Sequence, residues 1–251
     1  TDNIGITWVA LVSGALFGII IGKLVFGGTG QNIFNPAAVG MVFSKLCFGQ
    51  HYSYQNTWYS DVAAGGTSLS GGSYSFLDLF LGRCPGLMGE VCKAAILLGL
   101  AYLLIRRAAD WRIVVSYLGS FLFLMLFAGI IYQAAGKVAN AGSYLLSELL
   151  SGGLLFGATF MATEPVTSPL GRPGRIIYGV ILGSVNVLIR LFGSYPEGTV
   201  FSILIGNMLS PVIDYYKWAS NKYSWKNILW MALIPLATLL VVVWALCVEV
   251  F

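Results

Sequence analysis

Hydrophobic residues in this chain gather into long stretches that contain few polar positions. An α-helix needs about 20 consecutive apolar residues to cross a lipid bilayer. Measured against that length, the stretches predict about eight membrane-spanning segments. They cover residues 5–22, 33–48, 89–105, 112–133, 144–162, 176–192, 197–213 and 226–250. We therefore expect an all-α polytopic membrane protein, with residues 1–251 in a single transmembrane domain.

Two apolar stretches are short, and proline interrupts the pattern in each half of the chain. The 33–48 stretch is typical of a tilted or half helix, and residues 74–82 of a re-entrant or interfacial piece. Asn35 and Glu164 each precede a proline, which removes a backbone donor and disfavours helix at the preceding residue. Paired interruptions of this kind mark midplane binding sites in transporters. Two tight turns with proline at a helix start would give the same pattern.

The composition leaves no room for a separate soluble domain and argues against several functions. Of the 251 residues, 57% are hydrophobic and 10% are charged. The four cysteines lack metal-binding spacing and His51 is the only histidine, so we expect no zinc, iron–sulfur or bis-histidine haem site. The sequence leaves open a disulfide between Cys84 and Cys92. The net charge of +4 comes from loop lysines and arginines and does not indicate nucleic acid binding.

Basic residues gather in the connections at one side of the predicted spans. The four groups are Lys23; Arg106, Arg107 and Arg112; Arg172 and Arg175; and Lys217, Lys222 and Lys226. Short loops rich in lysine and arginine stay in the cytoplasm, so this side is predicted to be cytoplasmic. The loop at residues 51–73 then lies on the outer face.

Three acidic residues in or beside apolar stretches are candidates for an ion pathway: Glu90, Glu164 and Asp214. A carboxylate at membrane depth is costly and is usually kept to bind or relay a cation. Glu164 also lies beside a helix interruption, where carboxylates and free carbonyls bind Na⁺ or H⁺ in transporters. Helix capping is the ordinary alternative for Glu90 and Asp214.

Five ordered segments of this chain resemble one family of membrane flavoproteins, which comprises the RnfD protein of the Rnf electron-transport complex and the NqrB protein of the sodium-pumping NADH:quinone oxidoreductase. The segments are GGTGQNIFNPA at 27–37, DLFLG and GLMGE within 78–90, FMATEPVT at 160–167, IR and YPEG within 189–198, and N…PVID at 207–214. Together they cover roughly residues 20–216, and five motifs in order are far more specific than one.

The resemblance implies two flavins. In the family, FMN is joined through its phosphate to a threonine in a D-x-x-[ST]-G-A-T motif, which falls on Asp61, Gly65 and Thr67. Ala64 and Gly66 depart from that motif. The family also holds a non-covalent riboflavin, and Gln31, Asn32 and Asn35 are the residues we expect to form a polar floor for its ring.

The resemblance also implies the setting and the fold. The chain would be a redox component of a complex in the bacterial inner membrane, working with other subunits and quinone and moving Na⁺ or H⁺. It would not use NADH alone, because no dinucleotide-binding motif is present. Its fold would resemble the inverted repeats of urea and ammonium channels, with two or three further spans before Thr1. The alternative is a flavin-free channel or secondary transporter of the same fold.

Overall fold

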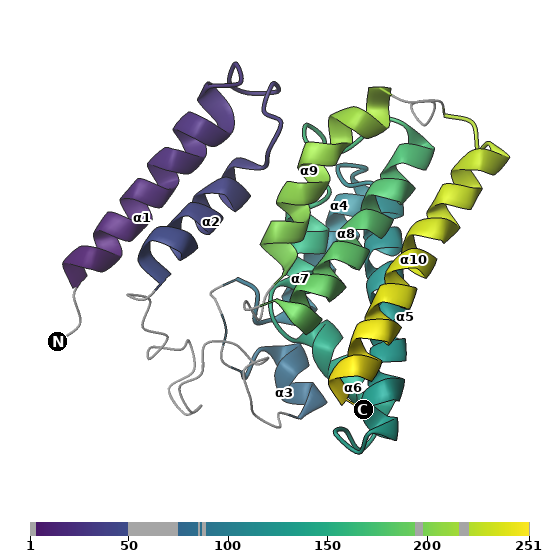
Figure 1. The fold of residues 1–251 in the computed structure, drawn as a ribbon. Helices are drawn as coiled ribbons and strands as arrows, with labels where there is room; N and C mark the ends of the chain where they lie inside the picture. Colours follow the sequence, from purple (N-terminus) through teal and green to yellow (C-terminus); the bar gives the residue numbers. More distant parts are fainter. Residues whose placement is uncertain are drawn as a thin grey trace.

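The structure is a computed structural model that describes residues 4–49, 75–84, 86, 89–193, 198–215 and 221–250. These residues form helices and connections, without a β-strand among them (Figure 1). The loop predicted to carry the covalent flavin, with Asp61, Gly65 and Thr67, lies outside the described residues.

The helices follow the apolar stretches of the sequence. In chain order they are α1 (Ile4–Ile19), the π-helical turn η1 (Ile20–Leu24), α2 (Pro36–Phe48), α3 (Phe76–Leu81), α4 (Lys93–Ile105), α5 (Trp111–Ala134), α6 (Ala141–Leu150), α7 (Leu154–Phe156), the π-helical turn η4 (Gly157–Met161), α8 (Arg172–Phe192), α9 (Thr199–Tyr215) and α10 (Trp225–Val250).

Three helices, α5, α8 and α10, are long and apolar enough to cross a membrane alone. A fourth crossing would combine α6 with α7 and η4, which are bent by 60° at their junction. The other apolar helices have 10–17 residues, so the described residues support a multi-pass membrane protein with three or four full-length spans. Residues 74–82 give the short helix α3, in keeping with the prediction of a short apolar piece.

The prediction of one continuous span over 144–162 is wrong. The helix stops at Leu150 and restarts at Leu154, and Gly152 has a φ of 65°. Only glycine adopts that left-handed conformation readily, so Gly152 supplies the bend. The sequence prediction places the interruption at Glu164, whereas the structure has this earlier bend as well as a helix end at Met161.

Small residues set the closest helix contact, between α5 and α8. A β-carbon placed on Gly179 would lie 2.0 Å from Ser116 Oγ, and one on Gly183 would lie 2.0 Å from Ser120 Oγ and 2.7 Å from the Tyr117 carbonyl oxygen. Without a hydrophobic effect to hold helices together in lipid, close backbone packing of this kind stabilises helix pairs. The core of the bundle is therefore built on the α5–α8 pair.

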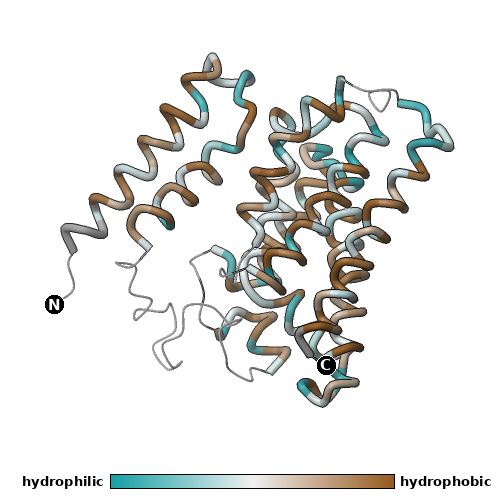
Figure 2. The backbone as a smooth tube through the Cα atoms, in the orientation of Figure 1, coloured by the Kyte–Doolittle hydropathy of each residue, from teal (hydrophilic) through white to brown (hydrophobic). Residues whose placement is uncertain are grey.

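α1 and α2 form a hairpin beside the bundle, and α2 contacts α9 (Figure 1). The hairpin also uses small residues, because a β-carbon on Gly18 would lie 2.5 Å from the Pro36 carbonyl oxygen. Figure 2 shows hydrophobic residues along the length of α1 and α10. Trp8 and Trp244 are 63% and 71% exposed on these two helices, which indicates contact with lipid or with another protein.

Candidate functional site

The two proline-interrupted segments meet at one end of the bundle. Asn32 and Asn35, from the connection before α2, both interact through their side chains with the Glu164 carboxylate, which follows η4. The Thr167 hydroxyl donates a hydrogen bond of 3.4 Å to Glu164 Oε2. Asn32, Asn35 and Thr167 are buried, so the carboxylate is lined by polar groups that are largely withdrawn from solvent.

Local hydrogen bonds fix the two asparagines. Asn35 caps α2, with its Oδ1 accepting from the Ala38 amide at 3.1 Å, and Pro36 occupies the first turn of the helix, where its missing N–H is not needed. Asn32 Nδ2 donates to the Phe34 carbonyl at 3.1 Å. The turn that interrupts the chain before α2 therefore also aims both amides at Glu164.

Two further side chains connect this cluster to the bundle. Asn207 of α9 accepts a 2.9 Å hydrogen bond from the Asn35 backbone amide and donates at 2.8 Å to the Tyr178 hydroxyl of α8, in the one amide orientation that gives the Asn35 N–H a partner. Both side chains are fully buried. Neither was singled out from the sequence, although a polar residue inside a long apolar stretch was the signal available. We call Asn32, Asn35, Glu164, Thr167, Tyr178 and Asn207 the inner polar cluster.

Glu164 lies in the connection between η4 and α8, outside the helices that span the membrane. Burial raises the pKa of its carboxyl, while the Asn32 amide, the Thr167 hydroxyl and the Lys23 ammonium act in the opposite direction. A carboxylate that has lost water on some sides but kept hydrogen-bonding partners is suited to exchange a proton or a bound cation.

Asp214 supports the same connection without a recorded contact to Glu164. Its two carboxylate oxygens accept from the Leu170 amide at 3.1 and 3.2 Å. Arg175 Nε donates to the Pro169 carbonyl at 2.9 Å, and its guanidinium pairs with Asp110. Asp214 and Arg175 therefore hold residues 162–171 in place from both sides.

The Asp110 carboxylate joins the starts of α5 and α8. It accepts from the Arg112 amide at 2.8 Å and binds the guanidinium groups of Arg112 and Arg175. Burial alone would raise its pKa, but the Arg112 backbone hydrogen bond and the Arg175 guanidinium outweigh that effect and lower it. The charged form is therefore the one that stabilises the fold.

We expect Asp110→Asn to destabilise the protein by about 1 kcal/mol near neutral pH, because asparagine still caps a helix but cannot form the ion pairs. A lowered folded-state pKa means that the stabilisation is present above the ordinary carboxyl value of about pH 4 and is lost as pH falls through the folded value. Thermal unfolding in detergent, followed from neutral pH into acid, should show wild type and variant converging as the pH falls. A gap that widens in acid would contradict this assignment.

Glu90 lies in a different place from Glu164. Lys93 Nζ donates to the Glu90 carbonyl and, at 2.8 Å, to the Gly152 carbonyl, and both charged residues are buried. A β-carbon on Gly153 would lie 2.5 Å from Glu90 Oε2. Glu90 thus packs against the bend between α6 and α7, and the three predicted ion-pathway residues do not form one site.

The remaining sequence-predicted residues are placed as follows. Gln31 is exposed, one position before the buried Asn32. Cys84 and Cys92 are both free thiols, so the disulfide that the sequence left open is not formed. Burial raises the pKa of the Cys84 thiol, which keeps it protonated and unreactive near neutral pH.

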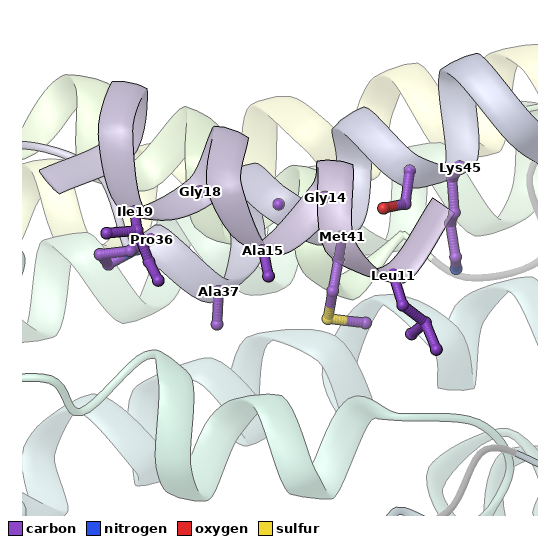
Figure 3. Close-up of a pocket in the computed structure, with 11 residues that line it drawn as sticks. Leu11, Gly14, Ala15, Gly18, Ile19, Pro36, Ala37, Met41 and Lys45 are labelled. Carbon is purple, nitrogen blue, oxygen red and sulfur yellow. The ribbon is translucent and has the colours of Figure 1, made fainter. Parts of the chain in front are cut away.

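An apolar groove of about 500 Å³ adjoins the inner polar cluster. Figure 3 shows Leu11, Met41 and Lys45 along it, between α1 and α2. Its other end reaches Pro36 and Ala37, directly after Asn35. The amides of the cluster are therefore next to a wall that could receive an apolar ring or chain.

Comparison with known proteins gives one consistent family. The model of the NQR2, RnfD, RnfE family matches residues 4–222. The chain is similar to proteins that are named as the NqrB component of Na(+)-translocating NADH-quinone reductase. The one from Chromohalobacter salexigens is 39% identical over 217 residues, covering 81% of this chain and 52% of the relative.

Two further relatives of the same name are similarly matched. The Azotobacter vinelandii protein is 37% identical over 221 residues, covering 83% of this chain and 54% of its own length. The Neisseria meningitidis protein is 32% identical over 227 residues, with the same two shares of 83% and 54%. The chain spans about half the length of the curated relatives it matches.

Proposed function

Because this chain belongs to the NQR2, RnfD, RnfE family, we propose that it is a membrane redox component of an Rnf- or Nqr-type complex, in which electron transfer is coupled to movement of Na⁺ or H⁺. The observation that carries the proposal is the convergence of two interrupted segments on one carboxylate, Glu164. Helix interruptions with a carboxylate and free polar groups are where membrane proteins bind translocated cations.

We propose that the apolar stretches of the chain cross the membrane about eight times, in the manner of channel-like inverted repeats. The shorter helices α1, α2, α4 and α9 accompany the full-length ones, which supports that count (Figure 1). The relatives and the apolar surfaces of α1 and α10 support a place in the bacterial inner membrane, with other subunits and quinone as partners.

Within this function, FMN is attached to Thr67, next to Asp61 and Gly65, and riboflavin binds at Gln31, Asn32 and Asn35. The residues fit a flavin ring, because Asn32 and Asn35 present amide groups and the groove at Pro36 presents an apolar wall. A flavin bound there supplies electron transfer. The asparagines would orient the ring, and Glu164 would hold the cation beside it.

The attachment is tested by mass spectrometry of the peptide that contains Thr67, from complex made in its own host. We expect that peptide to carry the added mass of FMN less water. Thr67→Val keeps the shape of the side chain but lacks the hydroxyl that a phosphoester needs, so it should carry no flavin, whereas Ser68→Ala should remain modified. An unmodified wild-type peptide, in a host with an active flavin transferase, would contradict the attachment.

The second candidate function is a channel or secondary transporter without flavin. The departures Ala64 and Gly66 from the attachment motif favour it. It makes the opposite prediction for the same peptide, and it keeps the role of Glu164 in cation binding.

A further inference from the structure

One face of α8 carries a row of buried residues at intervals of four: Tyr178, Leu182, Asn186 and Arg190. The first three are fully buried, and the Arg190 side chain is 2% exposed. Positions four apart lie above one another on a helix, so the row runs along α8 from one half to the other. Tyr178 belongs to the inner polar cluster, and Arg190 lies near the opposite end of the helix.

Asn186 is the centre of a second group of polar side chains. Its Nδ2 donates to the Tyr117 hydroxyl at 2.9 Å and lies 3.4 Å from Thr199 Oγ1. The Tyr117 hydroxyl lies 3.2 Å from Ser202 Oγ, which donates to the Thr199 carbonyl at 2.8 Å. The group joins α5, α8 and α9, and all four side chains are buried.

Two atoms of this region have no protein partner among the described residues. Asn186 Oδ1 and Arg190 Nε are both buried without a hydrogen bond. Rotating the Asn186 amide would put Nδ2 at the same unpartnered position, so the deficit does not depend on its orientation. Buried polar atoms are almost always satisfied by protein or by ordered water, because leaving one unpaired is costly. These two atoms, one helical turn apart, therefore indicate a hydrated position.

An ion pair closes this region at the outer side. Arg190 Nη1 lies 3.0 Å from Glu148 Oε2 and donates to the Glu148 carbonyl at 2.6 Å, and Nη2 donates to the Ser151 carbonyl at 3.2 Å. The guanidinium also lies over the Phe121 ring at 5.0 Å. A buried arginine held by a carboxylate and by the carbonyls at a helix bend can open only if those bonds are exchanged for others.

Leu182 separates this outer group from the inner polar cluster. A β-carbon on Gly206 would lie 2.4 Å from Leu182 Cδ2 and 2.9 Å from Tyr178 Cε2, so α8 and α9 are in close contact at this level. Leu182 and Ile203 are fully buried. Polar groups thus line both halves of the α8–α9 contact, with an apolar barrier between them.

We propose that Tyr117, Asn186 and Ser202 bind water inside the bundle and form the outer half of the path by which the cation reaches or leaves Glu164, with the Glu148–Arg190 pair as its outer gate. The barrier at Leu182 keeps the two halves from being continuous in this conformation. This inference rests on the proposed function, because it extends the route from Glu164 to the other face of the membrane.

The test uses Ag⁺, a monovalent cation of a size close to that of Na⁺, which reacts with thiols. In the assembled complex, with Cys47, Cys84, Cys92 and Cys247 replaced by alanine, single variants Asn186→Cys, Ser202→Cys and Val187→Cys are exposed to Ag⁺ from the outer face of spheroplasts. Loss of maleimide labelling after denaturation reports the reaction. Val187 is a neighbour of Asn186 on α8 and is equally buried, which makes it the matched control.

We expect cysteine at 186 and at 202 to react and cysteine at 187 to stay protected. Adding Glu148→Gln should speed the reaction at 186 about tenfold, the factor that loss of one charge-assisted hydrogen bond corresponds to. Protection of both 186 and 202, or reaction of all three positions alike, would overturn the path. An unchanged rate with Glu148→Gln would overturn the gate. Accessibility does not depend on turnover, so these outcomes are distinct from a failure of the Thr67 or Glu164 tests.

Discussion

Replacing Gly183 with isoleucine should leave little or no folded protein. A β-carbon at this position meets Ser120 Oγ at 2.0 Å, the Tyr117 carbonyl oxygen at 2.7 Å and the Phe121 amide nitrogen at 2.9 Å. Two of those atoms belong to the α5 backbone, so no side-chain rotation can make room and the two helices must separate. Separation would also break the hydrogen bond between Asn186 and Tyr117, which spans the same interface.

The size of the effect can be graded with smaller changes. We expect Gly183→Ala to destabilise by about 1–3 kcal/mol, the usual range for overpacking. Gly119→Ala is the matched control: it lies inside α5, yet a β-carbon there meets nothing within 4 Å. That change should be neutral or stabilise by about 0.5–1 kcal/mol, because alanine loses less backbone freedom than glycine. Folded yield and thermal unfolding in detergent measure both, and equal effects at 183 and 119 would contradict the packing argument.

The helices could be predicted because each follows an apolar stretch whose length and flanks are visible in the sequence. Asn35 before Pro36 indicated the start of α2, and the structure has that cap. The bend at Gly152 was not predicted, because a glycine pair in an apolar stretch can equally serve helix packing, as Gly179 and Gly183 do. Only the tertiary structure separates these two uses of glycine.

The candidate site was predicted in part. Interruptions at Asn35 and Glu164 are legible in the chain, but their meeting depends on how α2 packs on α9, which no local pattern specifies. The partners Tyr178 and Asn207 depend on the rotation of α8 and α9 about their axes. Glu90 looked equivalent to Glu164 in sequence, yet a buried lysine beside it places it in a different environment. The roles of Glu90, Glu164, Asp214 and Thr67 stay predictions.

Glu164→Gln should keep the fold and impair cation-coupled turnover of the assembled complex. Glutamine has the shape of glutamate and can still bond to the Asn32, Asn35 and Thr167 side chains that surround it. Since burial raises the pKa of this carboxyl, its charged form costs stability above the ordinary glutamate value, and a neutral side chain removes that cost. We therefore expect an unchanged or slightly higher unfolding temperature at neutral pH.

The effect on function should have the opposite sign. A charge-assisted contact contributes about 1.5–3 kcal/mol, so losing it should raise the half-saturating Na⁺ concentration about tenfold or more, or shift the pH dependence of turnover if the ion is H⁺. Asp110→Asn is the control, because it removes a carboxylate from the same end of the bundle but should lower stability and leave the cation dependence unchanged. Opposite signatures in the two variants would separate cation binding at Glu164 from a structural role. An unaltered Na⁺ titration and pH profile in Glu164→Gln would remove Glu164 from the pathway, since nothing else in the variant would have replaced its charge.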